Sequence, residues 1–176
     1  MKIAVIGYSG AGKSTLAEKL GEVFRADVLH FDAVQFLPGW AVRDDAEKRK
    51  ITEAFLDSHD SWVIDGNYTK LFYERRMAEA DRIVLLLFNR WTCLARAVRR
   101  YRTYRHTTRP DMADGCEEKL DAEFLRWILL GQRTRKTRER FRRLREQYPD
   151  KVLVAKNQKQ LDACFAALTR PSDGKS

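Results

Sequence analysis

The octapeptide from Gly7 to Ser14, GYSGAGKS, matches the pattern GxxxxGK[ST] at every fixed position. It follows a short apolar segment and precedes an amphipathic one, which is the strand, turn and helix context that the pattern requires. The glycines let successive backbone N–H groups surround a phosphate, and the first turn of the helix presents its positive end to the same anion. Lys13 would bridge the β- and γ-phosphates of a nucleotide, and the Ser14 hydroxyl would hold Mg²⁺. The pattern therefore predicts binding of ATP with Mg²⁺.

The residues expected to bind the nucleotide extend from the first glycine of this loop to the threonine after it. They are Gly7, Ser9, Gly10, Ala11, Gly12, Lys13, Ser14 and Thr15. The alternative is an ordinary glycine turn that leads into a helix. Such a turn needs neither Lys13 nor three glycines, so we favour the phosphate site.

The elements that must position this loop are short apolar strands that alternate with helices. Strands are expected at 2–6, 28–31, 62–64, 82–88 and 152–155, and helices at 13–25, 44–58, 71–80, 91–102, 118–146 and 158–168. This alternation predicts a doubly wound α/β fold with a parallel sheet. The length of 176 residues predicts a single domain, with a frayed tail at 171–176.

Charge and composition narrow the functional classes. Residues 90–145 carry 17 basic and seven acidic side chains, a net charge of +10, so a polyanion is expected to bind there. The three cysteines have no CxxC spacing, which favours a reducing cytoplasm over a disulfide framework or a zinc cluster. The longest apolar run, 83–88, is too short to cross a bilayer, and the chain begins almost directly with the glycine loop. We therefore expect no membrane span and no signal peptide.

Four stretches, GYSGAGKST, HFDAVQFLPGW, WVIDGNY and RPDMADGCEEKLDAEFLRWI, together carry a family resemblance. The chain resembles the adenylate-kinase-like branch of P-loop phosphotransferases, and within it the DNA topology modulation (FlaR-like) proteins. The resemblance implies a three-layer fold with a five-stranded parallel sheet in the order 2-3-1-4-5. It also implies a mobile Arg-rich helical lid at about residues 100–135. The family label describes a phenotype and leaves the reaction open.

The resemblance assigns roles to two acids. Asp65 matches the acid that ends the third strand of nucleotide kinases and orients the water around Mg²⁺. Asp32, at the expected end of the second strand, lies where related small-molecule kinases keep a carboxylate that holds or deprotonates the acceptor hydroxyl. Two alternatives stay open: Asp65-Gly66 is also a common turn, and Asp32 could be a simple turn or cap residue.

Three arginines are the candidate lid residues. Arg96 and Arg100 lie one helical turn apart and so share a face, which the resemblance places at the lid entry. The Arg109-Pro110-Asp111 tripeptide resembles the R-x-D pattern on the returning side of such lids. Arginine forks would stabilise the charge on a transferred phosphoryl group, although any one of them could be a solvated surface residue. The expected catalytic residues are thus Lys13, Asp32, Arg96, Arg100 and Arg109.

The acceptor side departs from nucleoside monophosphate kinases. The resemblance places their two acceptor-phosphate arginines near Gln35 and Thr69, and neither position is basic, so an ordinary monophosphate acceptor is not favoured. Arg43, Arg75 or Arg76 could substitute from nearby. The aromatic residues here suit a ring or a base, unless they only pack in the core. The expected acceptor-binding residues are Asp32, Phe36, Trp40, Tyr68 and Arg75.

Two functions from different classes are compatible with these features. The first is a small kinase that transfers the γ-phosphoryl group of ATP to a small-molecule, nucleoside or nucleotide acceptor near Asp32. The second is a nucleic-acid-associated ATP-binding protein, whose basic helix at 126–145 contacts backbone phosphates. We favour the kinase, because the loop, the acids and the arginines form a complete set for phosphoryl transfer.

Overall fold

The computed structural model describes residues 1–105, 107–109, 111–113 and 115–170. The tail expected at 171–176 and Pro110 of the R-x-D tripeptide lie outside these residues. Within the described chain, no helix is both long enough and apolar enough to span a membrane.

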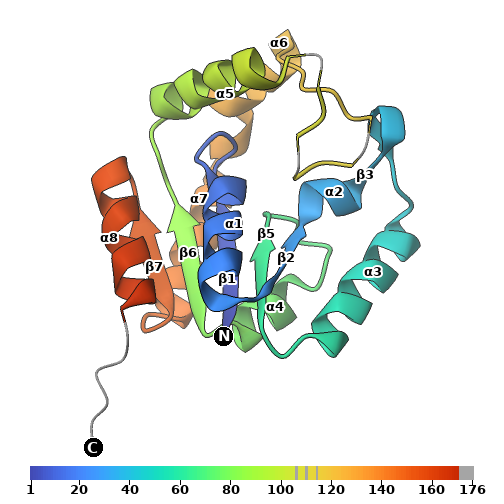
Figure 1. Ribbon diagram of the computed structural model, residues 1–176. Helices are drawn as coiled ribbons and strands as arrows, with labels where there is room; N and C mark the ends of the chain where they lie inside the picture. The colour runs from blue at the N-terminus through green and yellow to red at the C-terminus, as the bar shows by residue number, and fades with distance from the viewer. Residues whose placement is uncertain (106, 110, 114, 171–176) are drawn as a thin grey trace, which may run out of the picture.

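A parallel sheet forms the centre of the molecule (Figure 1). In the described residues its strands are β1 (Lys2–Gly7), β2 (Asp27–His30), β5 (Trp62–Asp65), β6 (Arg82–Leu86) and β7 (Val152–Ala155). Their spatial order is β2-β5-β1-β6-β7. Counted along the chain without the separate hairpin of β3 (Phe36–Leu37) and β4 (Ala41–Val42), this is the expected order 2-3-1-4-5. The predicted α/β fold is confirmed.

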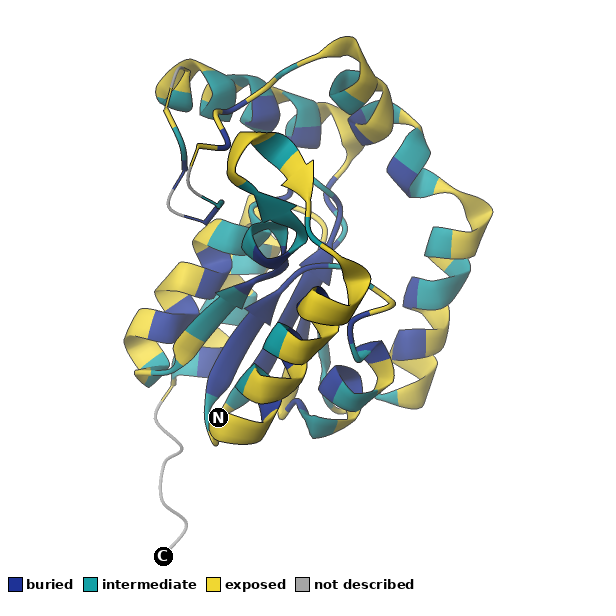
Figure 2. Cartoon of the chain, turned by 90° about the vertical axis from the view of Figure 1, so that its right-hand side faces the viewer, coloured by how far each residue is buried: buried dark blue, intermediate teal, exposed yellow. Residues whose placement is uncertain are grey.

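Helices cover both faces of the sheet and make three layers. In Figure 1, α1 (Lys13–Phe24) and α8 (Gln158–Thr169) lie in front of it, and α4 (Tyr73–Glu79) and α7 (Arg135–Gln147) lie behind. The central strands are buried on both sides, as the dark blue strands of Figure 2 show. A run of apolar residues such as 83–86 is what a strand covered on both faces requires.

The carboxyl ends of the strands carry the segments that could bind a ligand. There lie the loop between β1 and α1, α2 (Phe31–Gln35), the 3₁₀ turn η1 (Pro38–Trp40) and the first turn of α3 (Asp45–Ser58). Above them lie α5 (Arg90–Tyr104) and α6 (Ala122–Leu129) (Figure 1). The segment between these two helices packs on η1: the Trp40 indole N–H donates to the Glu117 carbonyl at 3.0 Å.

Two sequence predictions about elements are wrong, whereas the other expected boundaries agree to within two residues. The long basic helix expected at 118–146 is divided into α6, the 3₁₀ turn η2 (Gly131–Arg133) and α7. Gly131 lies so close to the Trp127 ring that a Cβ there would be 2.6 Å from it, and Thr134 caps α7 through the backbone N–H of Thr137 at 3.2 Å. These local features end α6 and begin α7.

The second error concerns Asp32, which does not end a strand. β2 stops at His30, and Asp32 lies in the first turn of α2. Phe31 explains the change of direction, because its ring is fully buried beneath the Arg76 guanidinium, 4.4 Å from the ring centroid. The chain turns where Phe31 is buried, and Asp32 therefore lies at the carboxyl edge of the sheet.

Candidate functional site

The loop after β1 is shaped by two glycines with positive φ. Gly10 has φ +77° and Gly12 has φ +93°, in the left-handed region that other residues rarely adopt. A Cβ on Gly10 would lie 2.5 Å from the Cys93 carbonyl oxygen of α5, so the loop leaves no room for a side chain there. Within the described residues, no side chain caps the N-terminus of α1. The loop and the first amides of α1 therefore fit an anion such as a phosphate group.

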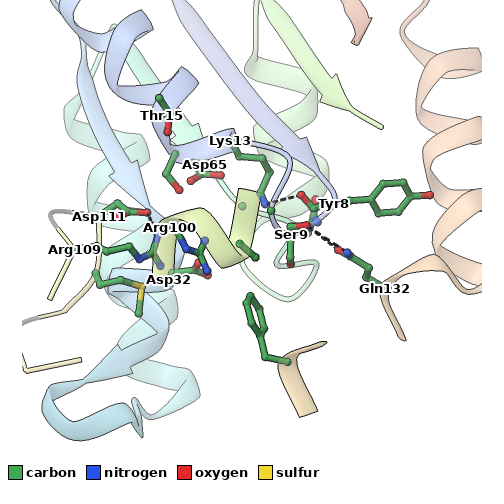
Figure 3. A pocket seen from close by; sticks show the side chains of 18 of the residues that line it. Tyr8, Ser9, Lys13, Thr15, Asp32, Asp65, Arg100, Arg109, Asp111 and Gln132 are labelled. Carbon is green, nitrogen blue, oxygen red and sulfur yellow. Dashed lines mark hydrogen bonds and ion pairs between the residues drawn. The ribbon is translucent and has the colours of Figure 1, made fainter. Parts of the chain in front are cut away.

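Asp65 lies at the end of β5, beside this loop (Figure 3). Burial opposes its ionisation, but the hydrogen bond with His30 and the charge of Lys13 outweigh this effect and hold the pKa of Asp65 below its usual range. Its Oδ1 is buried and has no hydrogen-bond partner among the described residues. An ionised carboxylate with an oxygen left over is a suitable partner for the water shell of Mg²⁺. The residues present thus fit a hydrated magnesium ion.

His30 is a member of this group that the sequence analysis did not assign to the site. Parallel pairing of β2 with β5 places His30 directly opposite Asp65, with Nδ1 3.3 Å from Asp65 Oδ2. Nε2 contacts the Glu18 carboxylate. Burial lowers the pKa of His30, but its hydrogen bonds with Asp65 and Glu18 dominate and raise the pKa to about 9. His30 is therefore an imidazolium at neutral pH.

Asp32 is held by a tyrosine. The Tyr68 hydroxyl donates a hydrogen bond of 2.7 Å to Asp32 Oδ1. Burial, and then the neighbouring Asp32 charge, raise the pKa of Tyr68, so the hydroxyl stays protonated and remains a donor. Among the described residues no hydrogen bond reaches the second carboxylate oxygen of Asp32, which can therefore meet a ligand. Asp32, Arg100 and Arg109 line the same cavity as Lys13 (Figure 3).

Arg100 and Arg109 meet on one carboxylate. Arg100 Nε donates to Glu118 Oε1 at 2.7 Å, and Arg109 Nε lies 2.6 Å from Glu118 Oε2. Arg109 also pairs with Asp111 at 2.7 Å. Arg109, Asp111 and Glu118 are buried and Arg100 is half-buried, so the four residues form a largely buried ion-pair cluster. We call these residues, Arg100, Arg109, Asp111 and Glu118, the arginine cluster.

Arg96 does not join this cluster, although it shares a helix face with Arg100. One of its guanidinium nitrogens donates to the Ala11 carbonyl of the glycine loop, and another donates to Gln158 at 2.6 Å. Its guanidinium lies 4.2 Å from the Phe88 ring centroid. Arg96 thus fixes the glycine loop from the side of α5.

A cavity of ≈ 2250 Å³ connects these groups. The expected site residues that line it are Ser9, Gly10, Gly12, Lys13, Ser14, Thr15, Asp32, Phe36, Trp40, Asp65, Tyr68, Arg96, Arg100 and Arg109. Gly7 and Ala11 are buried beneath the loop, where the Gly7 N–H donates to Asn67 Oδ1 at 3.0 Å. The structure therefore brings the proposed donor and acceptor residues to one space.

Arg75 is a correction to the expected acceptor set. It is not among the described residues that line the cavity, and its guanidinium contacts Glu79 at 2.6 Å and Asp57 at 2.7 Å. Arg76 cannot substitute either, because it is fully buried and donates to the carbonyl groups of the chain around it. Arg43 is similarly engaged with the Val34 carbonyl at 2.9 Å. Each of these arginines has other partners, and none of the three is among the described residues that line the cavity.

Lys48 and Gln132 also line the cavity, and the sequence analysis did not identify either of them as a site residue. Lys48 is 5% exposed, although it lies on a helix rich in charged residues. Its spacing of four from the buried Thr52, and of eight from Leu56, was the available signal for an inward face. Gln132 reaches the glycine loop from η2, 123 residues away in the sequence, and no local pattern indicates this contact.

Comparisons with known proteins bear on the fold. Neither a protein-family model nor a curated protein sequence matches the chain significantly. Shikimate kinase from Acinetobacter baumannii, in complex with shikimate, is similar with a TM-score of 0.57 and 16% identity, over 95% of this chain and 90% of that one. Deoxyadenosine kinase from M. mycoides with bound dATP is similar with a TM-score of 0.52 and 15% identity, over 97% of this chain and 100% of that one. The chain therefore has the fold of P-loop kinases.

Proposed function

We propose that this protein is a small kinase that transfers the γ-phosphoryl group of ATP to a hydroxyl group of a small-molecule, nucleoside or nucleotide acceptor. One observation carries the proposal: the glycine loop, Asp65, Asp32 and the arginine cluster line a single cavity. That cavity lies at the carboxyl edge of a parallel sheet, where α/β proteins bind their ligands. The fold that the chain shares with two kinases supports the proposal.

At the donor end of the cavity, the chain binds the triphosphate. Lys13 and the first amides of α1 hold the β- and γ-phosphates, and Arg96 keeps the loop in the required shape. Ser14 and Asp65 would hold Mg²⁺ and its water, and the bound ion supplies positive charge to the phosphate oxygens.

At the acceptor end, Asp32 orients the hydroxyl group and accepts its proton. The acceptor oxygen forms a bond to Pγ while the bond from Pγ to the β–γ bridging oxygen breaks, and ADP leaves. Tyr68 keeps Asp32 in place, and the guanidinium groups of Arg100 and Arg109 offer donors to the transferred group. Residues 100–135 act as the lid of a single domain and exclude water.

Two variants of the full chain test this proposal with a panel of nucleosides, nucleotides and sugars. We expect Lys13→Ala to lose affinity for Mg-ATP, and Asp32→Asn to keep that affinity but lose acceptor-dependent turnover. Full turnover by Asp32→Asn would remove its role as the base. Calorimetry that detects no binding of Mg-ATP or Mg-GTP to the folded protein would overturn the proposed function.

The nucleic-acid alternative has less support. The basic residues expected on one helix are divided between α6 and α7, and on α7 Arg135 and Arg142 pair with Glu139 and Glu146 at 2.8 Å. A shorter helix with part of its charge paired offers fewer contacts to a phosphate backbone. We therefore do not propose nucleic acid as a binding partner.

A further inference from the structure

The cations buried at the acceptor end of the cavity are already paired with acids. This end is formed by α2, the hairpin, the first turn of α3 and the segment that carries the arginine cluster. Within the cluster, two arginines face two carboxylates at 2.6 to 2.7 Å. Their long-range fields largely cancel, so the cluster as a whole attracts an additional anion weakly.

Lys48 is neutralised in the same way. Its ammonium contacts Asp45 Oδ1 at 2.5 Å and Gln35 Oε1 at 3.2 Å. Lys70, which lies 3.6 Å from the same Asp45, is 85% exposed and keeps its hydration. Lys119 is also exposed, with its ammonium 5.4 Å from the Trp40 ring centroid. Exposed lysines of this kind hold an anion weakly at physiological salt.

A phosphate on the acceptor would therefore have to displace a carboxylate from the arginine cluster. Glu118 is 3% exposed, so its displacement would leave a buried carboxylate without a partner. The Asp32 carboxylate, whose only hydrogen-bond partner among the described residues is the neutral Tyr68 hydroxyl, would repel the same phosphate. The γ-phosphoryl group of ATP does not meet the same repulsion, because the bound Mg²⁺ and Lys13 would balance its charge.

The acceptor end also offers aromatic faces. The rings of Phe36 and Trp40 are perpendicular neighbours with centroids 5.1 Å apart, and both line the cavity with Tyr68. Such faces bind a flat or puckered ring through stacking and apolar contact, without need of a charge. Polar groups that could fix ring hydroxyls, Asp32 and Gln35, lie on the same helix.

We propose that the acceptor is an uncharged ring alcohol, such as a nucleoside, and that Glu118 is the positioning residue that excludes phosphorylated acceptors. The proposal rests on the proposed kinase function and narrows its substrate class. Its chemistry is the transfer described above: the hydroxyl oxygen of the neutral ring binds Pγ, Asp32 takes the proton, and ADP leaves. Glu118 acts by neutralising both arginines through their Nε atoms, so that their remaining donors serve the transferred group but do not balance the charge of an acceptor phosphate.

The test uses matched pairs of acceptors with the full wild-type chain and Mg-ATP. Each pair is a neutral compound and its phosphate: adenosine and AMP, cytidine and CMP, thymidine and TMP, ribose and ribose 5-phosphate. We expect at least one neutral member to form product, with kcat/KM at least ~100-fold above that of its phosphorylated partner. Binding of Mg-ATP is measured on the same sample.

Glu118→Gln then tests the residue itself. It frees positive charge in the cluster, so the preference for the neutral member should fall by ~10-fold while Mg-ATP affinity is kept. Glu117→Gln is the matched control, because Glu117 is the exposed neighbour and its change should leave the preference as it is. If Glu118→Gln fails to fold, Asp111→Asn removes the other acid of the cluster and should shift the preference in the same direction.

Each outcome decides a different part of the proposal. Faster reaction of a phosphorylated member would overturn the neutral acceptor and leave the kinase function intact, since product still forms. An unchanged preference in folded Glu118→Gln would remove the role of Glu118. If the protein binds Mg-ATP but forms no product with any acceptor, the kinase function fails, and the substrate class fails with it.

Discussion

The side-chain amide of Gln132 forms two hydrogen bonds with the backbone of Ser9, in the middle of the glycine loop. Gln132 Oε1 accepts from the Ser9 N–H, and Nε2 donates to the Ser9 carbonyl at 3.4 Å (Figure 3). The amide is 4% exposed and also donates to the Ile128 carbonyl at 3.0 Å. The indole N–H of Trp127 adds a bond of 3.3 Å to Ser9 Oγ. The turn between α6 and α7 thus holds the glycine loop.

Gln132→Leu should therefore weaken the binding of Mg-ATP. Leucine has nearly the same volume as glutamine but cannot accept a hydrogen bond, so the Ser9 N–H loses its acceptor. An unsatisfied buried donor costs about 1–3 kcal/mol. If the loop relaxes to avoid this cost, the amides lose their arrangement around the phosphates. We expect the Kd of Mg-ATP to rise by about 10-fold, as measured by isothermal titration calorimetry.

Gln147→Leu is the matched control, since Gln147 is an exposed glutamine on α7 whose amide donates only to the adjacent Tyr148 hydroxyl in the described structure. Its Kd for Mg-ATP should equal that of the wild type. A folded Gln132→Leu protein with wild-type affinity would mean that the loop keeps its shape without the Gln132 amide.

Gly10 and Gly39 separate the cost of a positive φ from that of a close contact. Their φ angles are nearly equal, +77° and +75°. A Cβ on Gly10 would be 2.5 Å from the Cys93 carbonyl oxygen, whereas a Cβ on Gly39 would meet no described atom within 4 Å. Each alanine should lose about 1–2 kcal/mol for its backbone conformation. We expect Gly10→Ala to lower the free energy of unfolding by a further 1–3 kcal/mol or so, measured by urea denaturation. Equal losses would indicate that α5 moves aside freely.

The fold class could be predicted because its signals are local. Each strand is a short apolar run, and β6 is apolar from Ile83 to Leu86 because helices cover both of its faces. The strand order needed the family resemblance, since alternation of strands and helices fits several orders. Gly131 and the capping residue Thr134 are local signals of the division of the basic helix, and the sequence analysis overlooked both. The contact of Gln132 with the glycine loop, in contrast, is indicated by no local pattern.

In the candidate site too, contiguous motifs could be predicted from the sequence, whereas contacts between distant residues could not. The glycine loop is contiguous, so its residue types reveal its chemistry without a fold. The meeting of Arg100 and Arg109 on Glu118, and the pairing of Arg75 with Asp57, depend on side-chain directions that sequence spacing does not contain. His30 faces Asp65 only because β2 and β5 are neighbours in this register.

Tyr68→Phe should slow the proposed transfer without weakening nucleotide binding. The change removes the 2.7 Å hydrogen bond that orients Asp32 and keeps the aromatic ring. A hydrogen bond to a charged group contributes about 1.5–3 kcal/mol, so we expect kcat/KM for the acceptor to fall by at least about 10-fold. Steady-state kinetics with the best acceptor of the panel would measure this fall, and calorimetry would check that the Kd of Mg-ATP is unchanged.

Arg75→Ala is the corresponding control for the acceptor side. Because Arg75 contacts Asp57 and Glu79 away from the cavity, its loss should leave the KM of the acceptor as in the wild type. The effect on the free energy of unfolding should be at most about 1 kcal/mol, as for other ion pairs near the surface. A large rise in the acceptor KM would restore Arg75 to the acceptor site.

The pKa of His30 predicts how stability depends on pH in the metal-free protein. Burial lowers this pKa, but hydrogen bonds with Asp65 and Glu18 raise it to about 9, above the 6.5 of an unfolded histidine. The charged form therefore stabilises the folded state fully below pH 6.5, and this contribution disappears as the pH rises through 9. His30→Gln lacks the titration, so the difference in free energy of unfolding between wild type and variant should shrink between pH 6.5 and 9.5 or so. Urea denaturation in EDTA would measure it. A difference that stays constant over this range would mean that His30 is neutral in the folded protein.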